Sequence, residues 1–254
     1  MGLTMQPVLE TIALDKWFGG IHSINDVSFQ IEKGARRALI GPNGAGKTTI
    51  INLLTGVFQP NSGQILLDGA DITNLKPYSR VKRGMVRTFQ INQLFGEFTP
   101  LETLVFAVSE HHGAGWDLWQ PVAGKPQIVE EAVQILVQFQ LVDVMNERTA
   151  ILPYGKQRLL EIAVALACRP TLLLLDEPAA GIPESERRDI LASIVSLPAD
   201  VSVLLIEHDM DFVFNFANRI SVLVNGTLFV EGSPKEIERD PRVKAVYLGE
   251  SAHD

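Results

Sequence analysis

The sequence predicts an α/β protein built around a mostly parallel β-sheet. Short apolar runs typical of strands alternate with helical patterns along most of the chain, which is the pattern of a parallel sheet. A glycine-rich segment at residues 41–48 lies between one such strand and one such helix. The strands before that segment follow one another closely, which favours antiparallel pairing among them.

The composition fits one large domain. The chain has 254 residues, 46% hydrophobic and 20% charged, as in ordinary globular proteins. A net charge of −8 argues against a general nucleic-acid binder, which needs a basic face. The single cysteine, Cys168, excludes a disulfide within the chain. The first residues lack a signal-peptide pattern and the apolar runs are too short to cross a bilayer, so we expect any membrane association to require a partner.

Individual elements follow from the periodicity of apolar residues. The predicted strands are Val8–Leu14, Ser28–Ile31, Ala35–Ile40, Gln64–Leu67, Leu172–Leu175, Val201–Ile206, Ile220–Val224 and Thr227–Glu231. Asn225-Gly226 between the last two predicts a hairpin, since both turn positions need φ > 0. The predicted helices are Thr48–Thr55, Ile128–Phe139, Gln157–Ala167, Glu184–Leu197 and Asp211–Asn218. Residues 91–152 lack convincing strands and are predicted to form a largely helical inserted lobe, with a surface loop at Gly113–Pro126.

The glycine-rich segment has the residues of a phosphate-binding loop. Its glycines let the backbone aim N–H groups at phosphate oxygens, and the following helix N-terminus favours negative charge. Lys47 suits the β and γ phosphates, and the Thr48 hydroxyl suits Mg²⁺. The predicted phosphate-binding set is Gly41, Pro42, Asn43, Gly44, Ala45, Gly46, Lys47, Thr48 and Thr49.

Two carboxylates follow four leucines at the end of a predicted core strand. Ligands of open α/β sheets bind at this end, so Asp176 suits the Mg²⁺ shell and Glu177 suits a general base. Taken alone, the pair could equally be solvated acids. His208 after strand 201–206 could contact the γ phosphate, and Gln90 could contact Mg²⁺ and the attacking water. Without the other motifs, His208 and Gln90 would each be interpreted as an ordinary polar residue.

A further segment, Leu152-Pro153-Tyr154-Gly155-Lys156-Gln157-Arg158, lies before a long predicted helix. Together with the elements above, it resembles the ATP-binding-cassette ATPases, and the resemblance covers essentially the whole chain. The resemblance implies a P-loop NTPase fold in a single ATPase domain over 1–254. A RecA-like core with an antiparallel β subdomain would comprise 1–90 and 153–254, and the inserted helical subdomain would comprise 91–152.

A closer similarity is to the ATPase subunits of branched-chain amino acid importers. It rests on Val-Arg-Thr-Phe-Gln at 86–90, Tyr-Gly-Lys-Gln-Arg at 154–158, Asp-Glu-Pro-Ala-Ala-Gly at 176–181, Ile-Glu-His-Asp-Met at 206–210 and Ala-Val-Tyr-Leu-Gly-Glu at 245–250. The resemblance implies uptake of branched-chain amino acids or a related amide, urea or aromatic acid.

The resemblance also implies ATP and Mg²⁺ as cofactors and assigns roles to residues. Catalysis would fall to Glu177, His208, Gln90 and Lys47, and Mg²⁺ to Thr48, Gln90 and Asp176. Phe18 would stack on adenine, with Trp17 as a rival. The signature residues Tyr154, Gly155, Lys156 and Gln157 would bind a nucleotide held by a second ATPase subunit.

The implied partners are integral-membrane permease subunits, a second ATPase subunit that is identical or paralogous, and, indirectly, a solute-binding protein. No nucleic acid is expected as a partner. The implied location is cytoplasmic, on the inner face of the membrane.

Two departures from the family pattern concern the dimer. Pro153 replaces the usual signature serine, which removes a hydroxyl worth roughly 1.5–3 kcal/mol as a charge-assisted hydrogen bond. Pro183 stands where an aspartate is usual, so the two ATP sites could be unequal. The alternatives are a soluble cassette ATPase acting on nucleic acid or ribosomes, a non-catalytic nucleotide-binding regulator and a small-molecule kinase. The short inserted lobe argues against the soluble cassette ATPase. The presence of Glu177 and His208 argues against the non-catalytic regulator, and the signature and tail argue against the kinase.

Overall fold

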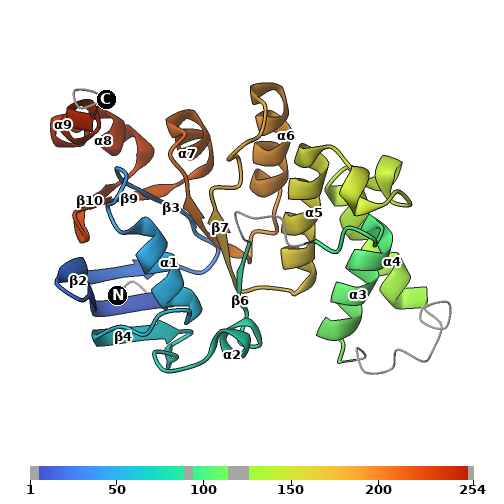
Figure 1. The fold of residues 1–254 in the computed structure, drawn as a ribbon, viewed down its shortest axis with the longest axis horizontal. Coiled ribbons are helices and arrows are strands. Elements are labelled where there is room, and N and C mark those ends of the chain that lie inside the picture. The colour runs from blue at the N-terminus through green and yellow to red at the C-terminus, as the bar shows by residue number, and fades with distance from the viewer. Residues whose placement is uncertain (1–5, 89–93, 114–125, 251–254) are drawn as a thin grey trace, which may run out of the picture. The chain divides into compact units, whose positions relative to one another are not determined.

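A computed structural model describes residues 6–88, 94–113 and 126–250, in two compact units (Figure 1). The first unit comprises residues 1–85, 171–177 and 198–254, and the second comprises 86–170 and 178–197. The predicted inserted subdomain, 91–152, falls within the second unit, which also takes in the helices on either side of strand 172–176. The subdomain boundaries drawn from the sequence stay a prediction.

The first unit contains a four-stranded sheet of order β2-β1-β4-β5. Its strands are β1 (Leu9–Phe18), β2 (Ile21–Ile31), β4 (Ser62–Leu67) and β5 (Ala70–Asp71). β1 pairs antiparallel with both β2 and β4, which confirms the antiparallel prediction for the early strands. β1 and β2 are longer than predicted because a two-residue turn, Gly19-Gly20, joins them directly.

The second sheet has six strands in the order β10-β9-β3-β8-β7-β6. The strands are β3 (Arg36–Ile40), β6 (Met85–Arg87), β7 (Leu172–Asp176), β8 (Ser202–Ile206), β9 (Arg219–Val224) and β10 (Thr227–Gly232). β3 pairs parallel with β8 and β9, and β7 pairs parallel with β8. The predicted hairpin is confirmed, because β9 and β10 are antiparallel and both Asn225 and Gly226 have positive φ.

Helix α1 (Lys47–Thr55) lies in the core of the first unit. Its apolar residues Ile50, Ile51, Leu53 and Leu54 are fully buried, in one cluster with residues of both sheets such as Leu9 and Leu174. The unit also contains α2 (Pro77–Val81), α7 (Met210–Phe216), α8 (Pro234–Arg239) and α9 (Pro241–Glu250).

The second unit is helical over the residues that the structure describes apart from the end of β6, which confirms the predicted character of the lobe. It contains α3 (Pro100–His111), α4 (Pro126–Gln138), α5 (Tyr154–Ala167), α6 (Glu184–Val195) and the 3₁₀ turns η2 (Val142–Val144) and η3 (Thr149–Ile151). α3 packs against α4 and α5, and α5 packs against α6. The predicted loop Gly113–Pro126 falls almost wholly outside the described residues.

None of the helices within residues 6–88, 94–113 and 126–250 has both the length and the apolar composition needed to cross a bilayer.

Arg80 on α2 is buried and caps the C-terminal end of α1. Its guanidinium donates to the carbonyls of Leu53 (2.7 Å) and Leu54 (2.5 Å) at the end of α1. It also donates to the carbonyls of Thr73 (2.7 Å) and Leu75 (3.0 Å). Carbonyls in the last turn of a helix have no partner within the helix, and a cation there also complements the helix dipole. Arg80 therefore fixes the far end of the helix that begins at the phosphate-binding loop.

We expect Arg80→Met to lower the free energy of unfolding by about 3 kcal/mol, because the carbonyls of the buried residues Leu54 and Thr73 lose their Arg80 donor. Calorimetry or urea unfolding measures the change. Arg83→Met, at an exposed position of the same segment, is the matched control and should be close to neutral. Equal stability of the two variants would contradict the capping role.

Candidate functional site

The candidate site lies at one edge of the six-stranded sheet, where three neighbouring strands end. Leu39 of β3 pairs with Ile206 of β8, and Ile206 pairs with Asp176 of β7. The chain leaves β3 into the phosphate-binding loop, β8 into Glu207-His208, and β7 at Asp176-Glu177. Because these strands are parallel, their carboxyl ends share an edge, which is where open α/β sheets bind ligands.

The loop leaves no room for side chains at Gly41 and Gly46. A Cβ on Gly41 would lie 2.2 Å from the carbonyl oxygen of Leu223, a backbone atom of β9. Gly46 has φ of 102°, and a Cβ there would lie 2.8 Å from Cδ1 of Ile24. Only glycine permits both the backbone conformation and the close approach. The loop is therefore wedged against β9 and β2 with its backbone exposed for a ligand on the other side.

The N-terminus of α1 is suited to an anion. No acidic residue occupies its first turn, so its free N–H groups and the positive end of its dipole are not neutralised locally. Lys47, its first residue, donates from Nζ to the carbonyl oxygens of Gly41 (2.6 Å) and Pro42 (2.9 Å). These bonds hold the ammonium group over the loop, and Thr48 follows in the same turn.

Neighbouring segments fix the shape of the loop. The Ala45 amide donates to the Pro42 carbonyl (3.1 Å), and the Ala45 carbonyl accepts from the Gly226 amide (2.9 Å) in the β9–β10 hairpin. On the other side, the Ser23 and Thr49 hydroxyls are hydrogen-bonded at 2.8 Å. The predicted phosphate-binding residues 41–49 thus form one braced strand–loop–helix unit.

The two carboxylates at the end of β7 have different environments. Asp176 is 4% exposed. Glu177 is partly exposed, and its backbone has φ of 46°, a left-handed conformation that is uncommon for a residue other than glycine. Its amide donates to the Ile206 carbonyl (2.8 Å), which holds this backbone in place. Residues held in unfavourable backbone conformations cluster at functional sites, so the geometry of Glu177 supports a functional role.

Glu207 is a residue that our reading of the sequence missed. It is 1% exposed, and its carboxylate accepts from the amides of His208 (3.0 Å) and Asp209 (3.4 Å). The side chain of His208 is 67% exposed, so the backbone contacts to Glu207 orient the start of this loop. The sequence did contain a signal for this residue, because Glu207 directly follows a buried strand and directly precedes His208.

Trp17 and Phe18 both lie at the end of β1 and are both partly exposed. The Trp17 ring stacks on His22 with centroids 3.7 Å apart, and His22 bonds to Asp15 at 2.6 Å. One face of the indole is therefore covered. The Phe18 ring meets Phe58 edge-to-face at 5.2 Å. The assignment of Phe18 to the adenine stays a prediction.

The other predicted site residues lie in the second unit. Gln90 falls outside the described residues. Tyr154 and Gly155 begin α5, whose N-cap residue Pro153 makes no side-chain capping bond. A Cβ on Gly155 would lie 2.1 Å from Oε2 at the end of the flexible Glu186 side chain, so a substitution there requires Glu186 to move.

Lys156 and Gln157 use their side chains within this unit. Lys156 bonds to the Gln140 carbonyl (2.6 Å), and Gln157 bonds to the Leu152 carbonyl (2.8 Å).

The residues at the sheet edge fit a nucleoside triphosphate with Mg²⁺. The loop offers backbone N–H groups and an ammonium group to phosphates, and Thr48 and Asp176 offer the oxygen donors that Mg²⁺ prefers. Across residues 6–88, 94–113 and 126–250, no cluster of three or more histidine, cysteine or acidic side chains forms a separate metal site.

Comparison with known proteins identifies relatives along the whole chain. The family model of the ABC transporter matches residues 24–180. The model of the branched-chain amino acid ATP-binding cassette transporter matches residues 228–253.

Curated relatives agree with these family matches. The high-affinity branched-chain amino acid transport ATP-binding protein BraF of Pseudomonas aeruginosa is 40% identical over 253 residues, covering 97% of this chain and 99% of the relative. The protein LivG of Escherichia coli, with the same description, is 36% identical and covers 97% of this chain and 99% of its own length.

Solved structures include an ATP-binding cassette of an ABC transporter in its ADP conformation. It superimposes with a TM-score of 0.84 at 32% identity, covering 96% of this chain and 99% of that one. A nucleotide-free ATP-binding cassette gives a TM-score of 0.81 at 31% identity, covering 95% of this chain and 98% of that one.

We expect Glu207→Ala to lower ATP hydrolysis about tenfold while nucleotide binding persists, because two backbone hydrogen bonds that orient His208 are lost. Steady-state hydrolysis by the transporter complex, with ATP binding by calorimetry, measures both effects. Asp211→Ala, an exposed acid nearby, is the control and should leave the rate unchanged. A wild-type rate in Glu207→Ala would exclude the orienting role.

We expect Phe18→Ala to weaken ATP binding more than Trp17→Ala does, because His22 already occupies one face of the Trp17 ring. Titration of ATP against each variant by calorimetry compares the two affinities. The opposite order would move the adenine platform to Trp17.

Proposed function

The chain belongs to the ABC transporter ATP-binding proteins, in the branched-chain amino acid transport family, and from this premise we propose that it drives import of branched-chain amino acids or a related small solute by hydrolysing ATP at Glu177. As a member of this family the chain binds ATP and energises transport. The catalytic part of the proposal rests on one edge of the sheet. There the phosphate-binding loop, Asp176 and Glu177 lie at the ends of neighbouring parallel strands.

The loop and α1 bind and orient the triphosphate. Backbone N–H groups of the loop, such as those of Gly44 and Gly46, and the N-terminus of α1 take the phosphate oxygens. The Lys47 ammonium moves from the Gly41 and Pro42 carbonyls to the β and γ phosphates, exchanging neutral acceptors for charged ones. Mg²⁺, held by Thr48, Asp176 and Gln90, would neutralise charge on the phosphate oxygens when bound.

Glu177 serves as the general base. The left-handed backbone of Glu177 and the hydrogen bond from its amide to the Ile206 carbonyl at the end of β8 support this role. A base within hydrogen-bond reach takes the proton of the attacking water as the bond to phosphorus forms. His208, oriented through Glu207, contacts the γ phosphate, and Phe18 stacks on adenine.

A transporter ATPase works with membrane subunits, so permease partners follow from the family. Further, we infer that two ATPase subunits, identical or paralogous, close on ATP, and that Tyr154 and Gly155 of one subunit face the nucleotide held by the other. The N-terminus of α5, which has no side-chain cap at Pro153, supports this role. A solute-binding protein supplies the solute on the outer side, which places this chain on the cytoplasmic face.

We expect Glu177→Gln to retain ATP binding and to lower hydrolysis by roughly 10²–10⁴-fold, the usual scale for a lost general base. Hydrolysis by the complex with its permeases, and ATP binding by calorimetry, measure the two properties. Lys47→Ala is the contrasting variant and should lose ATP affinity. Near-normal turnover in Glu177→Gln would exclude the role of the base, and unchanged binding in Lys47→Ala would refute the loop assignment.

The solute is tested separately by uptake into vesicles that contain the reconstituted transporter, with leucine, an amide, urea and an aromatic acid as competitors. Uptake that none of these competitors reduces would refute the proposed solute class while leaving the ATPase assignment intact.

A further inference from the structure

A local excess of positive charge surrounds the short helix α2 in the first unit (Figure 1). Residues 72–96 contain five lysines and arginines and no aspartate or glutamate, although the whole chain has a net charge of −8. Three of these cations, Lys76, Lys82 and Arg83, are exposed at the two ends of α2. An acidic protein therefore presents a basic surface at this one helix.

The charge of these three cations is not neutralised by the protein itself. Lys76, Lys82 and Arg83 form no ion pair with any residue that the structure describes, whereas other exposed cations of the first unit do. The acid that precedes the stretch, Asp71, is already engaged. Its carboxylate accepts from the Thr73 amide at 2.8 Å, and the hydrogen bonds from Thr73 hold the pKa of Asp71 below its usual value. The three cations are thus open to an anionic partner.

Exposed apolar side chains lie among the charges. Tyr78 is 64% exposed and Val81 is 44% exposed. Residues three and four positions apart share a face of a helix, so Tyr78, Val81 and Lys82 lie on one face. The Lys82 amide donates to the Tyr78 carbonyl at 3.1 Å, which keeps this turn helical. We call Lys76, Tyr78, Val81, Lys82 and Arg83 the α2 basic face.

Arg80 fixes which side of α2 faces outward. Its side chain is buried and donates to the carbonyls of Leu53 and Leu54 at the end of α1. These bonds hold one side of α2 against the first unit, so the α2 basic face cannot turn inward. The exposed cations and Tyr78 are therefore a fixed feature of the folded surface.

We propose that the α2 basic face contacts the anionic lipid headgroups of the membrane that holds the permeases. Lysine and arginine side chains bind an anionic membrane surface, and tyrosine favours the interface between water and the bilayer. The combination of unpaired cations with exposed Tyr78 and Val81 fits such a surface. A nucleic acid fits less well, because the net charge of −8 would repel it. The proposal rests on the membrane location inferred above and adds a direct lipid contact to it.

The test measures sedimentation of the full-length chain with permease-containing vesicles of two compositions at low salt. One kind is phosphatidylcholine alone, and the other is an equal mixture with anionic phosphatidylglycerol. We expect at least about 25-fold tighter binding to the anionic vesicles, since each basic residue near such a surface contributes about fivefold. Salt at roughly 0.3 M should narrow the difference by screening. No binding to the anionic vesicles, or equal affinity for both kinds, would overturn the proposal.

Variants locate the contact. We expect Lys82→Gln combined with Arg83→Gln to weaken binding to the anionic vesicles about 25-fold and to leave binding to the phosphatidylcholine vesicles unchanged. Lys235→Gln combined with Arg239→Gln, at exposed positions of α8, removes the same charge and is the matched control, which should bind like the wild-type chain.

Equal weakening of the Lys82 and Arg83 variant in both kinds of vesicle would overturn the proposal and assign the face to the permeases. Equal weakening by the α8 control would also overturn it, because total charge would then decide binding. ATP binding, measured by calorimetry without lipid, should be the same in all three proteins. Its loss in the wild-type chain would count against the ATPase proposal alone.

Discussion

The tight passage of the chain between β3 and α1 is the constraint on which the first unit depends. The loop must approach β9 so closely that Gly41 leaves no space for a Cβ beside Leu223, and Gly46 must hold a left-handed conformation against β2. Both sheets therefore pack around α1, whose apolar residues are buried between them. The same piece of backbone that packs against β9 and β2 holds the predicted phosphate-binding residues.

The C-terminal end of α1, opposite the predicted phosphate-binding loop, is also held in place. The Arg80 guanidinium donates to the carbonyls of Leu53 and Leu54, two fully buried residues in the last turn of α1. Burial lowers the pKa of Arg80 to about 10, which leaves the group charged at neutral pH. The positive charge at the C-terminal end of α1 complements the helix dipole, whose positive end lies at the predicted phosphate-binding loop. Arg80 thus stabilises α1 at the end opposite the predicted site.

The sequence predicted what local patterns determine and missed what distant contacts determine. The strand–loop–helix at 36–55 and the Asn225-Gly226 hairpin follow from glycine positions and apolar runs. Helices α3 and α8 were readable from their capping boxes, Thr99 with Glu102 and Ser233 with Glu236, but were not predicted individually. The partners of Arg80 and Arg37 come from segments that only folding brings together, so no local pattern reveals them.

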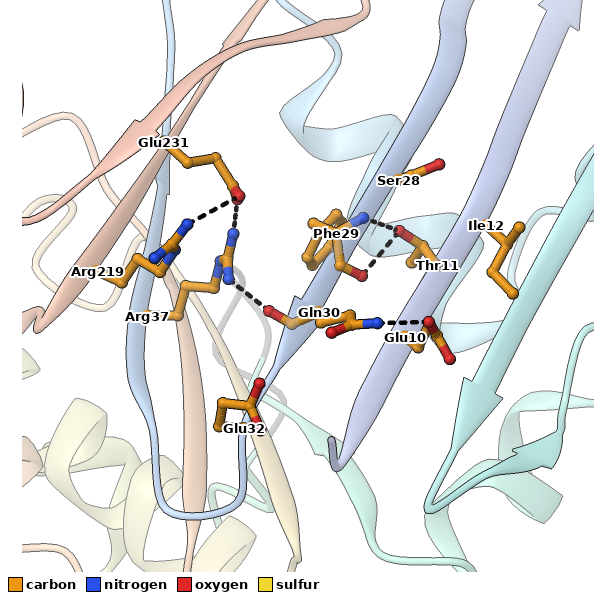
Figure 2. Close-up of a pocket in the computed structure, with 10 residues that line it drawn as sticks. All are labelled: Glu10, Thr11, Ile12, Ser28, Phe29, Gln30, Glu32, Arg37, Arg219 and Glu231. Atoms are coloured by element: carbon orange, nitrogen blue, oxygen red, sulfur yellow. Dashed lines mark hydrogen bonds and ion pairs between the residues drawn. The ribbon is translucent and has the colours of Figure 1, made fainter. Parts of the chain in front are cut away.

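The β9–β10 hairpin connects a polar pocket, lined by Arg37, Arg219 and Glu231 (Figure 2), to the predicted phosphate-binding loop. Arg219 and Glu231 stand at its open end, in the pocket, whereas Leu223 and Gly226 stand at its turn, against Gly41 and Ala45. β3 joins the same two sites through its register with β9. Contiguity alone does not couple two sites, because a ligand shifts an equilibrium only by binding one state more tightly than another.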